Sequence, residues 1–378
     1  MYPRKEPAEW AETHTYQEII MADIHENPLG TCGFDFVEYA AKDPKMLHDL
    51  FVSLGFTPVA KHKSKDITLY KQGDIRFFIN AEKSGFPAQF TTDHGPCACS
   101  MGFRVKDADF AFKGALERGA VKAEGDDYLV DVPCIDGIGG SRLYLIDTFG
   151  DKTAFDEDFV AIEGADEAAN YADMDYIDHL THNVYRGNMD KWAGFYEKVF
   201  NFKEIRYFDI EGKLTGLLSR AMTSPCGLIR IPINESQDDV SQIAEYLDEY
   251  KGEGIQHIAL GSNDIYKSVD KLRSLGVNFQ ETPDTYYEQL DGRVEGHGEP
   301  TEELKKRNIL LDGAPTDGQG ILLQIFTKNV IGPIFFELIQ RKGNEGFGEG
   351  NFQALFDSIE ADQIKRGVLN ADGTAAAE

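Results

Sequence analysis

The sequence predicts an α+β fold of two domains, each built from two copies of a unit in which a strand and a helix are followed by several strands. Three observations support this prediction. The chain has 378 residues, which suits two domains of ordinary size. Hydrophobic residues make up 42% and charged residues 27%, as in globular proteins with large cores. The order of predicted strands and helices also recurs along the chain, which indicates an internal repeat.

The first unit opens with a strand pattern at residues 35–38. A helix follows, because Asp43 is a suitable N-cap and Pro44 suits the first helical position. Apolar residues then recur at helical spacing until Gly55 ends the helix. The unit closes with strands, the last of which reads IRFFIN at residues 75–80.

The second half of the chain repeats this order. A strand at 178–181 precedes an amphipathic helix, and the strands after it end in IRIPIN at residues 229–234. A further strand–helix unit follows in each half, starting at Ser100 and at His257. The first half has Phe36 and Ser100 where the second has His179 and His257. We therefore expect one half to carry chemistry and the other to be structural.

These landmarks divide the chain into segments. The stretch 163–173 is polar and rich in alanine, as linkers are. The expected segments are an N-terminal extension at 1–29, a structural domain at 30–160, a catalytic domain at 170–366 that includes a C-terminal helix at 351–366, and a tail at 367–378.

Charge and composition restrict the partners. Lys and Arg number 38 against 65 Asp and Glu, and the net charge of -27 disfavours nucleic acid and anionic membranes as partners. No stretch has the roughly 18 to 20 apolar residues of a membrane span. The polar N-terminus lacks the apolar core of a secretory signal, so we expect a cytoplasmic protein. The five cysteines include no CxxC pair and are expected to be reduced thiols, mostly buried.

Two of the nine histidines lie in apolar strand patterns. His257 lies within GIQHIAL, and His179 follows YID. Each belongs to the first strand of its unit, so pairing of the two units would bring both imidazoles together. His182 competes with His179, but strand alternation turns it to the opposite face.

Glu337 is the third candidate ligand, because it lies in the apolar strand pattern IFFELI. A buried carboxylate costs several kcal/mol unless it is paired or bound to a cation. The alternative to a metal is an ion pair with Arg341 or Lys342. Two imidazoles and one carboxylate leave up to three open positions on an octahedral metal, which is the arrangement of non-haem Fe(II) oxygenases. The spacing alone does not exclude Zn, Mn or Ni.

Five segments resemble 4-hydroxyphenylpyruvate dioxygenases: IDH at 177–179, GIQHIA at 254–259, LLQIFT at 322–327, FELIQR at 336–341 and GFGEGNF at 346–352. The resemblance extends from about residue 30 to residue 366 and is densest in the second half. That family belongs to the vicinal-oxygen-chelate superfamily, which is glyoxalase/bleomycin-resistance/dioxygenase-like. The resemblance thus implies two domains of paired βαβββ units, each an open barrel-like sheet, plus a C-terminal helix.

The resemblance also implies a site and a reaction. The family's metal ligands for Fe(II) fall on His179, His257 and Glu337. Catalytic polar groups fall on Ser219, Asn234, Gln242, Gln256 and Gln324, and substrate-binding positions fall on Phe326, Phe335, Phe347, Asn351, Phe352 and Phe356. The implied reaction of tyrosine catabolism converts 4-hydroxyphenylpyruvate, a small 2-oxo acid, and O2 to homogentisate and CO2. A homo-oligomer, dimer or tetramer, is also expected.

Three alternatives remain at this point. A 4-hydroxymandelate synthase would hydroxylate the side chain instead of the ring, and an extradiol catechol dioxygenase would release no CO2. A protein of another class could bind or sequester a ligand on the same scaffold. Residues from 346 onward are expected to form a helix that Asn351 can cap and that packs on the second-half barrel. A further hypothesis, compatible with the first, is that this helix is a lid over the pocket, hinged on glycines.

Overall fold

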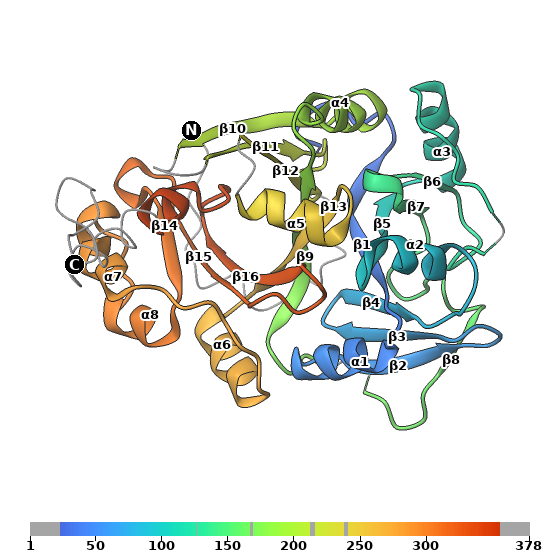
Figure 1. The fold of residues 1–378 in the computed structure, drawn as a ribbon, viewed down its shortest axis with the longest axis horizontal. Helices are drawn as coiled ribbons and strands as arrows, with labels where there is room; N and C mark the ends of the chain where they lie inside the picture. The colour runs from blue at the N-terminus through green and yellow to red at the C-terminus, as the bar shows by residue number, and fades with distance from the viewer. Residues whose placement is uncertain (1–22, 126, 167–168, 212–215, 238–240, 356–378) are drawn as a thin grey trace.

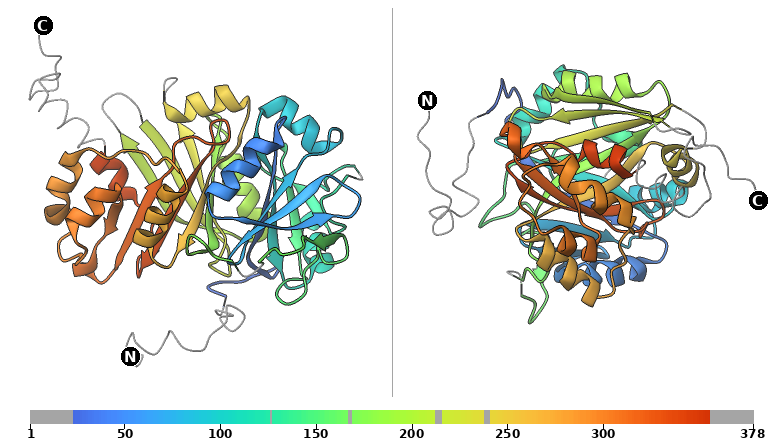
Figure 2. Two further views of the ribbon diagram at one scale, coloured as in Figure 1. Left: turned by 90° about the horizontal axis from the view of Figure 1, so that it is seen from below. Right: turned by 90° about the vertical axis from the view of Figure 1, so that its left-hand side faces the viewer.

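The computed structural model describes residues 23–355 except 126, 167–168, 212–215 and 238–240, and shows two lobes side by side (Figure 1). Each lobe is built on one eight-stranded sheet within the described residues, and helices lie on the outside of the sheets (Figure 2). This is the predicted α+β architecture.

The first lobe contains the strand order β6-β7-β5-β1-β4-β3-β2-β8. The elements are β1 (Thr31–Ala40), α1 (Pro44–Ser53), β2 (Thr57–His62), β3 (Ile67–Gln72), β4 (Ile75–Asn80), α2 (Phe86–His94), β5 (Cys97–Val105), α3 (Ala108–Glu117), β6 (Cys134–Asp136), β7 (Arg142–Ile146) and β8 (Phe159–Ala161). Asp43 caps α1 as predicted, since its carboxylate accepts from the Lys45 amide at 3.1 Å.

The second lobe has the matching order β10-β11-β12-β9-β13-β16-β15-β14. Its elements are β9 (Met174–Val184), α4 (Met189–Phe200), β10 (Lys203–Glu211), β11 (Gly216–Thr223), β12 (Arg230–Ser236), α5 (Gln242–Tyr250), β13 (Gly254–Ser262), α6 (Ile265–Ser274), α7 (Asp284–Arg293), α8 (Thr301–Arg307), β14 (Leu310–Gly313), β15 (Ile321–Phe326) and β16 (Phe335–Lys342). A further helical segment covers residues 349–355.

The strand register shows that the two lobes repeat each other. Phe36 pairs with Arg76 between parallel strands β1 and β4, and His179 pairs with Arg230 between β9 and β12. The central strands β1 and β5, like β9 and β13, are antiparallel. The units are not identical, however. The second unit of the first lobe has only an isolated bridge at Lys122 where a further strand would lie, and α7 and α8 are inserted in the last unit.

The side chains at matching positions of the two sheets differ between the lobes. In the first lobe an apolar cluster fills the space beside the sheet, and Phe36 packs against Phe78, Tyr144 and Phe155 at ring-centroid distances of 5.4 to 5.7 Å. By register, Ser100 and Tyr144 occupy the positions of His257 and Glu337. The first lobe therefore has the aromatic residues Phe36 and Tyr144 where the second has His179 and Glu337, and a serine where it has His257.

One core joins the two lobes. Phe336 of β16 is fully buried, and its ring lies 5.9 Å from that of Phe77 and 6.5 Å from that of Tyr39 in the first lobe. These residues belong to one continuous cluster of buried apolar side chains. The strand that carries Glu337 is thus packed directly against the first lobe.

Candidate metal centre

His179, His257 and Glu337 come together on three neighbouring strands of the second sheet. Ala259 of β13 pairs with His179 of β9 on one side and with Glu337 of β16 on the other. His257 lies two residues before Ala259 and therefore on the same face of β13. Pairing of the two units brings the imidazoles together as the sequence predicted.

The three side chains are almost fully buried, and their candidate ligand atoms lie within 4.8 Å of one another. Glu337 Oε2 is 3.1 Å from His179 Nε2 and 3.4 Å from His257 Nε2. Within the described part of the chain, this is the only cluster of three or more His, Cys, Asp or Glu side chains that could hold a metal ion.

Hydrogen bonds orient both imidazoles with Nε2 toward Glu337. His179 Nδ1 lies 2.8 Å from Asp178 Oδ1, and His257 Nδ1 lies 2.8 Å from Gln256 Oε1. A carboxylate or amide oxygen can only accept, so each Nδ1 donates and each Nε2 offers its lone pair to the centre. This is how metal-ligating histidines are usually supported, and the donor set fits a divalent metal of the iron type.

Electrostatics also favour cation binding. Burial alone would raise the pKa of Glu337, but the neighbouring His179 and His257 outweigh it and lower that pKa. Burial opposes protonation of His179, yet the carboxylates of Glu337 and Asp178 raise its pKa. Burial lowers the pKa of His257. Glu337 and His179 therefore stabilise charge on each other, whereas His257 is favoured in its neutral, metal-binding form, and a cation would take the place of the proton between Glu337 and His179.

Asp178 is a residue that the sequence analysis did not single out. Its carboxylate is fully buried and accepts two hydrogen bonds from Arg341, at 2.7 and 2.8 Å. Burial would raise the pKa of Asp178, but Arg341 and Arg230 hold it well below the usual value. The alternative of an ion pair between Glu337 and Arg341 or Lys342 is therefore wrong: Arg341 binds Asp178, and Lys342 binds Glu299.

A cavity opens above the three candidate ligands. Predicted site residues form much of its wall, namely Ser219, Asn234, Gln324, Phe326, Phe347 and Phe352. Phe335 stacks on the His257 ring at a centroid distance of 4.8 Å, and Phe347 meets the His179 ring edge-on at 5.4 Å. The cavity thus combines aromatic walls with a few amide and hydroxyl groups, as small-molecule sites do.

Four of the predicted positions that the structure describes do not line the cavity: Gln242, Gln256, Phe335 and Asn351. Gln242 is exposed to solvent because it is the first residue of α5, just after the N-cap Ser241, and it does not line the cavity. Gln256 lies behind His257 and contacts its Nδ1 instead of the cavity. Asn351 does not cap the final helical segment, since that segment already starts at residue 349. Phe356 lies outside the described residues.

Several cavity residues were missed: Thr181, Leu217, Ala221, Pro232 and Glu349. Thr181 is in contact with His257, with 2.9 Å between its hydroxyl oxygen and Nε2. Strand alternation could have identified it, because Thr181 lies two residues after His179 on β9. The same rule groups Leu217 and Ala221 with Ser219. His182, as predicted, faces away and bonds the Tyr196 hydroxyl at 2.7 Å.

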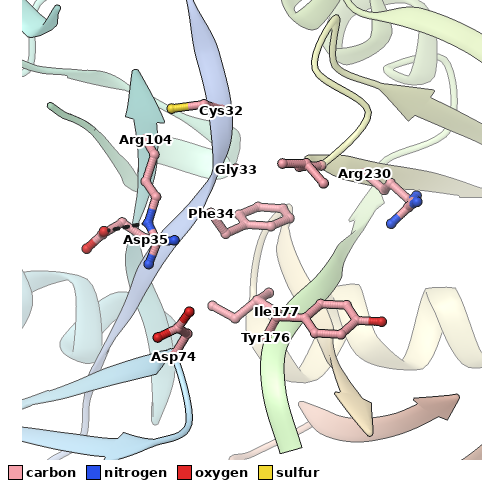
Figure 3. A pocket seen from close by; sticks show the side chains of 10 residues that line it. Cys32, Gly33, Phe34, Asp35, Asp74, Arg104, Tyr176, Ile177 and Arg230 are labelled. Carbon is pink, nitrogen blue, oxygen red and sulfur yellow. Dashed lines mark hydrogen bonds and ion pairs between the residues drawn. The ribbon is translucent and has the colours of Figure 1, made fainter. Parts of the chain in front are cut away.

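A second cavity lies between the lobes. Figure 3 shows Arg104 and Asp35 on the first-lobe side, and Tyr176, Ile177 and Arg230 on the other side. Asp35 accepts from Arg104 at 2.9 Å and from Arg76 at 3.1 Å. Asp35 in the first lobe therefore corresponds to Asp178 in the second lobe, and its partner Arg76 occupies the position that matches Arg230.

All five cysteines are free, and four of them are buried. Among the described residues, no helix is both long enough and apolar enough to cross a membrane.

Comparison with known proteins identifies the family. Residues 25–160 match "Hydroxyphenylpyruvate dioxygenase, HPPD, N-terminal", and residues 176–298 match the "Glyoxalase/Bleomycin resistance protein/Dioxygenase superfamily". A 4-hydroxyphenylpyruvate dioxygenase of Pseudomonas aeruginosa is 60% identical over 348 residues, which are 91% of this chain and 97% of the relative. The chain belongs to the 4-hydroxyphenylpyruvate dioxygenase family.

Other similar proteins bear different names. Hemolysin VllY of Vibrio vulnificus is 59% identical over 351 residues, with 91% of this chain and 98% of that protein covered. A solved triple mutant of 4-hydroxymandelate synthase from Streptomyces coelicolor matches at 25% identity with a TM-score of 0.74, covering 88% of this chain and 99% of that one. The fold is therefore that of the vicinal-oxygen-chelate superfamily, and the chain is an oxidoreductase of the 4-hydroxyphenylpyruvate dioxygenase family.

Proposed function

We propose that this chain converts 4-hydroxyphenylpyruvate and O2 to homogentisate and CO2, with Fe(II) bound by His179, His257 and Glu337. The observation that carries the proposal is the buried set of two imidazoles and one carboxylate at the floor of an aromatic-walled cavity. The name of the 60% identical relative supports the substrate.

His179, His257 and Glu337 line the cavity and would hold the ion at its wall. Bound Fe(II) would supply Lewis acidity and the capacity to activate O2. The protein's own task is to place the reactants. The 2-oxo acid end of the substrate faces the open side of the triad, and the phenol ring extends between the cavity walls.

Aromatic and polar side chains hold the substrate in this orientation. Phe326 and Phe352 line the cavity and provide flat apolar surfaces for the ring. Ser219, Asn234 and Gln324 supply hydrogen bonds to its polar ends. Phe335 and Phe347 pack against the two imidazoles, where they keep water away from the reacting atoms.

The segment after β16 forms the lid in this proposal. Arg341 Nη1 donates to the carbonyl oxygens of Asn344 and Gly346, at 3.0 and 2.6 Å, and so fixes the start of the segment. At its far side Glu349 lies 3.5 Å from Arg206 of β10. The segment therefore extends from β16 to the edge strand β10, and Phe347, Glu349 and Phe352 of it line the cavity. Its closure would protect the reaction.

The test is to load the protein with Fe(II) without oxygen, add 4-hydroxyphenylpyruvate and O2, and identify the product. Homogentisate with one CO2 per turnover is expected. 4-Hydroxymandelate would instead indicate the side-chain reaction, and O2 uptake with a catechol but without CO2 would indicate an extradiol enzyme. A His257→Ala variant serves as the metal-site control and should lose both Fe(II) and turnover. Light scattering of the same sample measures whether the protein is the expected dimer or tetramer.

A further inference from the structure

Helix α7 is connected to Glu337 by a series of hydrogen bonds, although it does not line the cavity. It belongs to the insertion in the last unit and lies in the half of the second lobe that is far from the first lobe (Figure 1). Tyr286 and Arg293 both reach the side-chain oxygen of Asn351, at 2.6 and 3.1 Å. Tyr286 and Asn351 are buried, with 1% and 2% of their surface exposed.

The direction of these hydrogen bonds is fixed by groups that can only donate. The Tyr286 oxygen accepts from the Leu311 amide at 2.9 Å and from Arg293 at 2.7 Å. Both of its lone pairs are then used, and its own O–H must donate. Two acceptors are within reach, Asn351 Oδ1 at 2.6 Å and the Leu311 carbonyl oxygen at 3.1 Å, and the shorter distance favours Asn351. A guanidinium has no acceptor, so Arg293 also donates to that atom. The Asn351 carbonyl oxygen must therefore face α7, and its NH2 group must face the cavity side.

This orientation is transmitted to the metal ligand. Asn351 Nδ2 donates to Gln324 Oε1 at 2.8 Å, and Gln324 Nε2 in turn donates to Glu337 Oε1 at 3.1 Å. The other carboxylate oxygen, Oε2, is the one that lies next to His179 and His257. Gln324 and Glu337 are 1% and 2% exposed, so bulk water does not compete for these bonds.

We infer that Tyr286 and Arg293 are positioning residues of the metal centre: they set the polarity of a chain of hydrogen bonds through Asn351 and Gln324 that turns Glu337 Oε2 toward the ion. Reversal of the chain would place Gln324 Oε1 against Glu337 Oε1, and two oxygen lone pairs would repel each other in a buried site. The same polarity leaves the second N–H of the Gln324 amide free to donate to an acceptor in the cavity. This inference rests on the proposed Fe(II) site, but not on the identity of the substrate.

Substitution of Asn351 by Asp and by Ala separates this role from simple packing. Asp has nearly the same shape but cannot donate while ionised, so Gln324 must reverse its amide toward it. Asn351→Asp is then expected to weaken Fe(II) binding about 10- to 100-fold, the usual effect of losing an outer-shell partner. Asn351→Ala removes the partner without forcing the reversal and should weaken binding less. If Asn351 only filled space, the order would be the opposite.

Substitutions in α7 provide the second test. Tyr286→Phe and Arg293→Met each leave one donor to Asn351 and should reduce Fe(II) affinity only slightly. The double variant leaves none, and a loss of about 10- to 100-fold that exceeds the product of the single effects is expected. Tyr287→Phe is the matched control, because Tyr287 is also buried in α7. Its hydroxyl donates to the Ile309 carbonyl oxygen at 3.2 Å, which is not part of the hydrogen-bond series to Glu337.

Fe(II) affinity is measured without oxygen by competition with a coloured chelator, and thermal unfolding confirms that each variant is folded. Parent-like affinity of folded Asn351→Asp, or of the folded double variant, overturns the inference while leaving the proposed reaction intact. A parent protein that binds no Fe(II) overturns the proposed function and this inference together. The expected order, with the Tyr287→Phe control at parent affinity, supports it.

Discussion

Asp178→Asn should weaken both the fold and the metal centre, by amounts that the structure predicts. Asp178 is fully buried and accepts two hydrogen bonds from Arg341, and breaking such a buried pair costs about 3–5 kcal/mol. An asparagine whose oxygen still accepts from Arg341 turns its NH2 group toward His179 Nδ1. His179 must then move its proton to Nε2, the atom that faces the metal. A 10- to 100-fold loss of Fe(II) affinity is expected, or about 1.4 to 2.7 kcal/mol.

The assay combines urea unfolding of the metal-free protein with an anaerobic Fe(II) titration. Asp35→Asn is the matched control, because Asp35 is equally buried and accepts from Arg76 and Arg104 at the corresponding place in the first lobe. It should lose comparable stability and retain the parent Fe(II) affinity. If both variants bind Fe(II) equally well, Asp178 does not control the His179 tautomer and the reasoning fails.

Three further predictions concern the second lobe. Gly348 has φ +76°, and a Cβ there would lie 1.5 Å from Gln324 Oε1, so Gly348→Ala should reduce turnover about 100-fold. Gly343→Ala is the control, because it has similar backbone strain (φ +84°) but no contact closer than 3.7 Å. Equal activities of the two variants would show that the clash with Gln324 does not matter. Burial lowers the pKa of His182 to about 3, so between about pH 6.5 and pH 3 the unfolded chain binds a proton at His182 that the folded protein does not. The free energy of unfolding should therefore fall by up to about 1.4 kcal/mol per pH unit as the pH is lowered through this range. His182→Gln should lack that part of the slope in urea unfolding, and parallel curves for parent and variant would refute it. Deletion of residues from 346 onward should abolish homogentisate formation by removing the lid, whereas full activity of the deletion would rule the lid out.

Local patterns were sufficient to predict that His179, His257 and Glu337 come together in one buried cluster. Alternation along β9 and β13 identified His179 and His257 and excluded His182, because a strand places every second side chain on one face. The carboxylate of Glu337 stood out because its apolar neighbours predicted a buried strand. The repeat also predicted that the other half would have no ligands, and there Phe36 takes part in an aromatic cluster.

Partners distant in sequence could not be predicted in this way. Asp178 and Arg341 are 163 residues apart, and nothing local connects them. Arg341 was instead considered a partner of Glu337, although four residues along a strand separate two side chains by roughly 13 Å. Gln242 and Asn351 were assigned from resemblance alone, and their actual orientations depend on where α5 and the final helical segment begin.

The contact of Phe336 with Tyr39 and Phe77 has a consequence for any attempt to divide the chain. The half without ligands provides the surface against which β16 is seated, one residue before the acidic ligand. The second half expressed alone would expose a large aromatic side chain and loosen the strand that presents Glu337. The half without the metal-binding cluster is therefore needed as a packing surface for the half that carries it.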